Sequence, residues 1–169
     1  GVRAAGTAVI GFDKNMRNVN SIAQLSEGSF RALEKQVAGL AGKTAQSPRV
    51  LAEGLYDIVS SGFKAKTSLS KTSEAIKVLE AAALAGTAGL TSTAVASKAV
   101  AAVLNAYRLK ASQAGKVSDA LFRTVDRGVI SFEELANNVG DVLPFASALG
   151  VNIKQVGAAT ATMTKAGVS

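Results

Sequence analysis

An all-α fold is predicted, as an array of about seven short helices joined by links that glycine, serine and proline mark. Apolar side chains recur at helical spacing, capping residues precede several of these runs, and no sustained segment alternates with the two-residue period of a strand. Of the 169 residues, 48% are hydrophobic but only 5% are aromatic. Because small side chains bury little area each, we expect a thin core.

Residues 1–46 are predicted to form an N-terminal helical extension. For residues 1–20 the sequence does not decide between a helix and irregular structure, because Gly6 and Gly11 each lower helix stability by about 1 kcal/mol relative to alanine. A helix over about 21–42 is better supported by its recurring apolar residues. Gly42 is expected to cap this helix, since glycine adopts a positive φ at little cost.

A sharp helix start is predicted at Ser47 and Pro48. The serine oxygen can accept a hydrogen bond from an orphan backbone N–H, and proline at the first helical position needs no N–H of its own. The helix is expected to end within the Ser-Ser-Gly sequence at 60–62. A polar, basic connection is then expected over residues 64–71.

Two further helices are predicted in the middle of the chain. Ser73 is expected to begin the first, which should stop near Gly86 or Gly89. Thr91 or Ser92 is expected to cap the second. Gly86 and Gly89 also have the GxxG spacing of a nucleotide loop, but no strand precedes them, so a helix break is the favoured interpretation.

The next predicted helix covers about 117–127, after a short link that Gly115 closes. Ser131 and Glu134 match the capping box, in which the serine binds the third helical N–H and the glutamate reaches back. The helix that follows contains Pro144, which is expected to kink it because proline lacks an N–H.

The last helix is predicted to begin at Asn152, after a break at Gly150, and to end before Gly167. No strict internal repeat appears along the chain, and no heptad pattern lasts for three or four repeats. A long continuous coiled coil is therefore not indicated.

The chain carries 19 basic and 12 acidic residues, a net charge of +7 that favours an anionic partner. The charges are spread out, and Lys64, Lys66 and Lys71 form only a loose cluster. Because no basic run is interleaved with aromatic residues, most of these charges are interpreted as solvated helix faces. No specific nucleic-acid site is predicted.

The residue types needed for catalysis are largely missing. Without cysteine or histidine, the chain has no thiolate nucleophile and lacks the commonest metal ligand and general base. Glu133 and Glu134 are adjacent, so they point to different sides of a helix. The sequence AGKT at 41–44 resembles the end of a phosphate loop, but Val37 stands where a glycine is needed. We predict no enzyme and no catalytic, cofactor-binding or metal-binding residues.

The longest uncharged run covers residues 81–97, between Glu80 and Lys98. A membrane span needs about 20 predominantly apolar residues, and this run contains several glycine, serine and threonine residues. A helix–turn–helix is therefore favoured. A membrane-active helical segment, forming a pore or a DNA passage, remains the alternative function.

Three stretches resemble, in order and spacing, the core region of phage tail tape measure proteins. They are LAEGLYDIVSSGF at 51–63, VLEAAALAGTAGLTSTAVASKAVAAVLNAY at 78–107, and LFRTVDRGVISFEELANNVGDVLPFASALGVNIKQVGAATATMTKAG within 117–167. Residues 47–169 are accordingly interpreted as the tape measure core. Because the sequence begins at Gly1 without a methionine, we expect it to be a fragment of a longer chain.

The resemblance implies a structural virion protein from a phage or prophage. Such proteins are long helical chains in the lumen of the tail tube, whose length sets the tail length while tube subunits polymerise around them. The implied partners are tail tube and tail tip or initiator proteins, further copies around the tail axis, and transiently the host envelope. The implied locations are the virion tail lumen and, during assembly, the host cytoplasm.

Two hypotheses follow. Repeated helix breaks indicate a folded unit and not a straight rod, so this core is expected to dock at a tail end or pack against its own copies, while the ruler lies elsewhere. The positive charge is expected to favour an acidic tube lumen or the DNA that later fills it.

Overall fold

The computed structural model describes residues 2–67, 72–89 and 91–168, with side chains from residue 11 onward. These residues form eight α-helices, one 3₁₀ turn and no strand, which confirms the all-α fold. The helices are α1 (Val2–Ala23), α2 (Glu27–Thr44), α3 (Pro48–Ser60), α4 (Glu74–Ala88), α5 (Thr93–Ala106), α6 (Ala114–Arg127), α7 (Phe132–Ala148) and α8 (Ile153–Lys165), and the 3₁₀ turn η1 is Ala111–Gln113.

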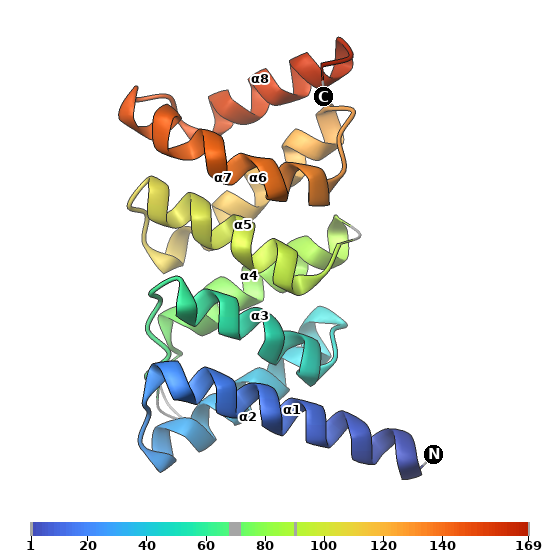
Figure 1. Cartoon of the computed structure of the whole chain (residues 1–169), viewed down its shortest axis with the longest axis vertical. Coiled ribbons are helices and arrows are strands. Elements are labelled where there is room, and N and C mark those ends of the chain that lie inside the picture. The colour runs from blue at the N-terminus through green and yellow to red at the C-terminus, as the bar shows by residue number, and fades with distance from the viewer. Residues whose placement is uncertain (1, 68–71, 90, 169) are drawn as a thin grey trace.

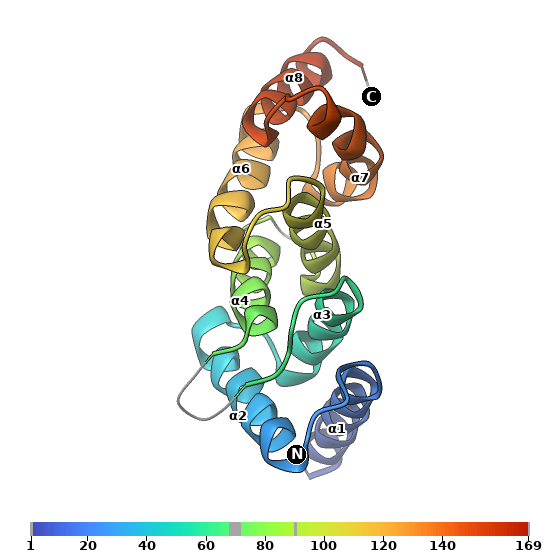
Figure 2. The ribbon, with the colours of Figure 1, turned by 90° about the vertical axis from the view of Figure 1, so that its left-hand side faces the viewer.

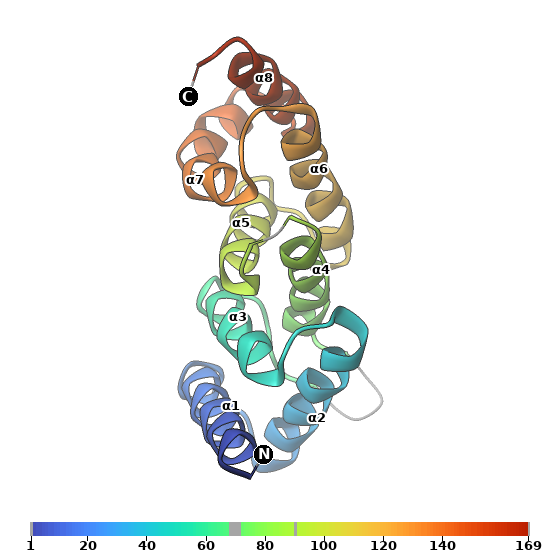
Figure 3. The same cartoon turned by 90° about the vertical axis from the view of Figure 1, so that its right-hand side faces the viewer.

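The helices form an elongated two-layer stack with the two chain ends at opposite ends (Figure 1). Helices α1, α3, α5 and α7 pack in order as one layer, and α2, α4, α6 and α8 form the other (Figures 2 and 3). Each helix therefore packs on the helix two places along the chain. The arrangement is that of a repeat protein, although the sequence shows no repeat.

The core lies between the two layers. Its largest fully buried side chains are Met16, Leu33, Leu51, Leu55, Ile58, Leu79, Leu104, Leu121, Phe132 and Leu143. Alanine fills much of the space where α4 meets α5, so these helices approach closely. At the crossing of α3 and α5, a β-carbon on Gly54 would lie 2.8 Å from Ser97 Oγ.

The predicted helix starts are confirmed where a side chain caps the backbone. The oxygens of Ser47, Ser73 and Ser92 each accept a hydrogen bond from the N–H three residues later, at 3.1 to 3.3 Å. Asn152 caps α8 in the same way, with Gln155 completing a capping box. Of the two candidates for the cap of α5, the structure selects Ser92.

The N-terminal prediction needs correction. Residues 2–23 form one helix, and the expected helix over 21–42 begins only at Glu27. The break lies at Gln24, whose φ is 49°, and the Asn20 side chain there accepts a hydrogen bond from Leu25 N–H. Because no glycine or proline marks this turn, the sequence pattern did not show it.

Two predicted glycine breaks are also wrong. Gly42 lies inside α2, and the helix ends at Ala45 with a φ of 53°. Gly115 lies in the first turn of α6, which begins at Ala114 directly after the 3₁₀ turn η1. Gly62, Gly150 and Gly167 do adopt positive φ after α3, α7 and α8. Within the connection expected over 64–71, residues 68–71 lie outside the described residues.

Helix α7 continues through Pro144 without a break. The expected kink at that residue stays a prediction. In the part of the chain that the structure describes, no helix combines the length and apolar character needed to cross a membrane.

Candidate anion-binding groove

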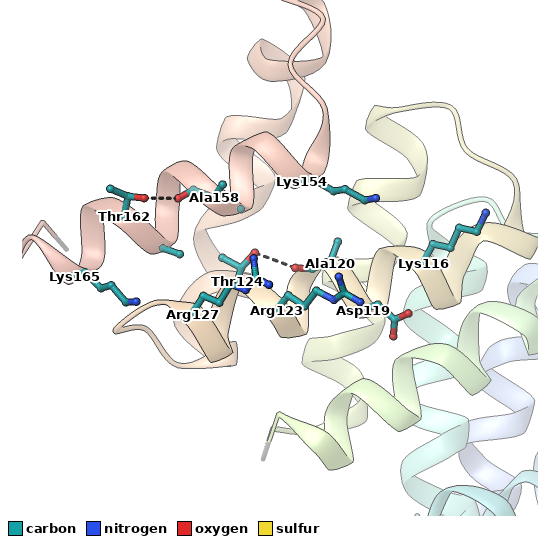
Figure 4. A pocket seen from close by; sticks show the side chains of 12 residues that line it. Lys116, Asp119, Ala120, Arg123, Thr124, Arg127, Lys154, Ala158, Thr162 and Lys165 are labelled. Atoms are coloured by element: carbon teal, nitrogen blue, oxygen red, sulfur yellow. Dashed lines mark hydrogen bonds between the residues drawn. The ribbon is translucent and has the colours of Figure 1, made fainter.

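Helices α6 and α8 enclose a surface groove of about 660 Å³ in the second layer of the stack (Figure 4). Five basic side chains and one acidic side chain line it together with small residues. The lining consists of Lys116, Asp119, Ala120, Arg123, Thr124, Arg127, Lys154, Gly157, Ala158, Ala161, Thr162 and Lys165. We call this feature the α6–α8 groove.

Helical periodicity brings the basic residues to the groove. On α6 the lining residues Lys116, Ala120, Arg123 and Arg127 have the spacing i, i+4, i+7 and i+11, and Lys154, Ala158, Ala161 and Lys165 repeat it on α8. Residues at this spacing share one helix face. Lys116 and Lys154 thus lie toward one end of the groove, and Arg127 and Lys165 lie toward the other (Figure 4).

Glycine and threonine hold the two walls together. A β-carbon on Gly157 of α8 would overlap the hydroxyl of Thr124, which donates a hydrogen bond to Ala120 O at 3.0 Å. After α6, a β-carbon on Gly128 would lie 3.2 Å from Ala161 Cα. Thr164 Oγ1 accepts a hydrogen bond from Val129 N–H at 3.0 Å. These close contacts fix the register of α8 on α6.

The five cations of the groove are exposed, and within the described residues none of them forms an ion pair. The ion pairs found in that part of the chain all lie between residues 13 and 98, and they are Arg17–Asp13, Arg31–Glu27, Arg49–Glu53 and Lys98–Asp57. The groove side chains carry five positive charges and one negative charge, a net +4.

Two of these cations stand where the helix itself is already positive. Lys116 and Lys154 lie in the first turns of α6 and α8, and neither first turn contains an acidic residue. A cation near a helix N-terminus is unfavourable by roughly 0.3–1 kcal/mol, because it faces the positive end of the helix dipole. An anion bound at this end would relieve that repulsion.

The neighbouring helix α7 has the opposite charge. It contains Glu133, Glu134 and Asp141 and no basic residue. The predicted capping box is present, with Glu134 Oε2 accepting hydrogen bonds from Ser131 N–H at 2.8 Å and from its hydroxyl at 2.7 Å. These bonds hold the pKa of Glu134 below its usual range. The two adjacent glutamates therefore act at a helix start, as interpreted from the sequence.

The other motifs considered from the sequence lie in helix ends. Residues 41–44 form the last turn of α2, and Gly89 is the C-terminal cap of α4. Among the described residues, no three acidic side chains converge as metal ligands would. The prediction of no catalytic, cofactor-binding or metal-binding residue stays a prediction.

Sequence reasoning missed the groove because its cations do not form a run. They are spread over positions 116–165, and α7 separates the two walls along the chain. The matching helical spacing on α6 and α8 was the available signal. It becomes informative only once these helices are known to be neighbours.

Helix α7 also exposes apolar side chains at the C-terminal end of the stack. Phe145 is 72% exposed and Leu149 is 80% exposed, and Val142 on the same side of the helix is half exposed. Their spacing of three and four residues makes one stripe, which we call the α7 stripe. Exposed apolar patches of this kind mark interaction surfaces.

Comparison with known proteins gives the chain a family. It is 28% identical over 167 residues to the tape measure protein of Pneumococcus phage Dp-1, covering 98% of this chain and 14% of that protein. It is 28% identical over 158 residues to a probable tape measure protein of Clostridium phage phiCD119, covering 94% and 16%. The chain thus spans about a seventh of the length of these relatives.

No solved structure matches the chain. The resemblance to tape measure proteins noted from the sequence is confirmed over nearly the whole chain. A model of the phage-related minor tail proteins matches residues 34–169. Since this match covers most of the helical stack, the chain belongs to the family of phage-related minor tail proteins.

Proposed function

We propose that the chain is a structural, non-enzymatic part of a phage tail tape measure protein. In this role it helps to set tail length and to scaffold assembly of the tail tube within the lumen, and it leaves the tail during infection. The observation that carries the proposal is the similarity to two tape measure proteins along nearly the whole chain. The fully helical architecture agrees with it.

The stack supports a division of labour within such a protein. As one continuous helix, 169 residues would extend about 250 Å at 1.5 Å per residue. Among the described residues the longest helix has 22 residues, about 33 Å, and the helices fold back on one another. This region is therefore proposed as a compact docking unit, with the length-setting ruler in other parts of the protein.

In-frame deletions in a tape measure gene that carries this sequence test the division. Removing helical blocks outside residues 1–169 should shorten the tails in proportion to the residues removed, as measured by electron microscopy. Removing α3 together with α4 should instead stop assembly, because these helices supply the central part of the hydrophobic core. If deletions within 51–167 gave intact tails of proportionally reduced length, this region would be part of the ruler.

We further propose that copies of the chain associate through the α7 stripe. The stripe leaves Phe145 and Leu149 largely exposed to water, and exposed apolar patches of this kind mark interaction surfaces. A second copy packed on the stripe would remove these side chains from water. The same contact would place the copies around a common axis.

Light scattering after gel filtration tests this association. The Phe145→Asp, Leu149→Asp double variant should lower the average mass at a given concentration. The Ile22→Asp, Leu84→Asp double variant, which changes two exposed apolar residues on α1 and α4, is the matched control. A wild-type chain that stays monomeric at high micromolar concentration, or a control that dissociates the copies equally, would exclude the stripe as the contact.

A further inference from the structure

We propose that the α6–α8 groove binds the sugar–phosphate backbone of double-stranded DNA, without reading its sequence. The inference does not depend on a role in setting tail length. It rests on the charge, the dimensions and the lining chemistry of the groove.

The charge of the groove is not compensated within the described chain. Five basic side chains and one carboxylate line the groove, and none of the five has an ion-pair partner there. The first turns of α6 and α8 add their dipoles at the end that carries Lys116 and Lys154. Asn152 already accepts hydrogen bonds from the N–H groups of Lys154 and Gln155, so at the start of α8 the lysine side chain and the helix dipole are what attract phosphate.

The dimensions fit a row of phosphates. From Lys116 to Arg127, and again from Lys154 to Lys165, eleven residues span about 16 Å of helix. One DNA strand carries a phosphate about every 3.4 Å along the duplex axis, so this length corresponds to about five phosphates, which wind about half a turn around the duplex. The three cations on α6 and the two on α8 therefore set an upper limit of five phosphate contacts.

The lining favours a phosphate backbone over exposed bases. No aromatic side chain lines the groove, so bases have nothing to stack on. The hydroxyls of Thr124 and Thr162 donate to the backbone oxygens of Ala120 and Ala158, at 3.0 and 2.9 Å. These donors are therefore already engaged within their own helices, and the contacts that remain are those of mobile cations with phosphate oxygens.

The same lining disfavours an acidic segment of a partner protein. Protein interfaces draw most of their affinity from large apolar or aromatic anchors in fitted pockets. The uncharged residues of the groove are glycine, alanine and threonine only, so it offers no such pocket. A ligand held almost entirely by charge is the better fit.

Fluorescence anisotropy with a labelled 20-base-pair duplex of random sequence tests the proposal on the 169-residue chain. With this upper limit of five phosphate contacts, the logarithm of the association constant should fall with that of the salt concentration at a slope of about −4.5. Between 50 and 200 mM salt, this slope corresponds to a loss of affinity of about 500-fold. A second duplex of unrelated sequence should bind equally well.

The groove variant is Arg123→Gln, Arg127→Gln, Lys154→Gln. It should reduce the slope to about −1.8, so that the same salt change costs only about tenfold in affinity. The matched control is Lys14→Gln, Lys35→Gln, Lys77→Gln, which removes the same charge from exposed positions outside the groove. It should keep the wild-type slope. Circular dichroism melting establishes that both variants remain folded.

Three results would overturn the proposal. The first is that the wild-type chain does not bind DNA at 50 mM salt. The second is that the control variant weakens binding as much as the groove variant, which would indicate general attraction to a positive surface. The third is that labelled poly-glutamate loses binding in the groove variant while DNA does not. That result would assign the groove to an acidic protein segment, such as α7 of a second copy.

Discussion

Gly157 lies so close to Thr124 that a β-carbon at residue 157 would overlap the threonine hydroxyl. This contact brings the first half of α8 against the last turn of α6. Further close contacts follow it toward the end of α6, where Gly128 meets Ala161 and Val129 N–H donates to Thr164, and the cations line the groove between the two helices. Because Gly157 has no side chain, α8 can approach α6 this closely.

Gly157→Ala should destabilise the chain by about 1–3 kcal/mol, because an inserted methyl group must displace α8 or rotate Thr124 away from Ala120 O. The measurement is chemical denaturation followed by circular dichroism. Gly140→Ala is the control, since nothing lies within 4 Å of its β-carbon and alanine favours the helix. Equal stabilisation by both substitutions would show that the contact is not tight.

Local chemistry made much of the fold predictable. Ser47, Ser73, Ser131 and Asn152 cap the backbone within three residues, so each helix start can be deduced from adjacent side chains alone. The turn at Gln24 was missed because Asn20, and not glycine, stabilises it. Local patterns cannot show which helices become neighbours, so neither the two-layer stack nor the groove could be predicted.

Replacing serine by alanine is predicted to have opposite effects on stability at two buried positions. Ser97 Oγ is buried against Gly54 and has no hydrogen-bond partner among the described residues, whereas Ser118 Oγ donates to Ala81 O at 3.2 Å. Ser97→Ala should therefore stabilise the chain by about 1 kcal/mol, because it removes an unpaired polar group. Ser118→Ala should destabilise it by about 0.5–1.5 kcal/mol.

Thermal melting of the two serine variants beside the wild type measures this difference. Each substitution removes one oxygen and improves helix propensity equally, so the pair isolates the effect of the hydrogen bond. A lower melting temperature for Ser97→Ala than for wild type would mean that its hydroxyl has a partner, such as a water molecule.

The capping box of α7 predicts an acid-sensitive helix start. Because hydrogen bonds from Ser131 lower the pKa of Glu134 in the folded state, the stability that this carboxylate contributes is present above its unfolded pKa. It is lost as the pH falls through the lower, folded pKa. Glu134→Gln should flatten this part of the curve of melting temperature against pH.

Ser131→Ala removes the reciprocal half of the same box and should cost about 0.5–2 kcal/mol at neutral pH. Since it also removes the hydrogen bonds from the serine hydroxyl, it should reduce the pH dependence without abolishing it. If Glu134→Gln left the acid side of the curve unchanged, the carboxylate would have no part in capping.

For Asp57 on α3, the opposite dependence of stability on pH is predicted. Burial raises the pKa of its carboxyl group, and Lys98, whose Nζ lies 4.0 Å from Oδ1, only partly opposes this effect. The folded state therefore binds the proton more tightly than the unfolded state, so stability falls as the pH rises from the unfolded pKa through the folded one. Asp57→Asn should raise the melting temperature above this window and leave it nearly unchanged below.

Lys98→Met should steepen the fall of stability with pH, because it removes the cation that favours the ionised form of Asp57. A melting temperature that Asp57→Asn lowers at neutral pH would instead show that the Lys98 pair outweighs the cost of burying the charge.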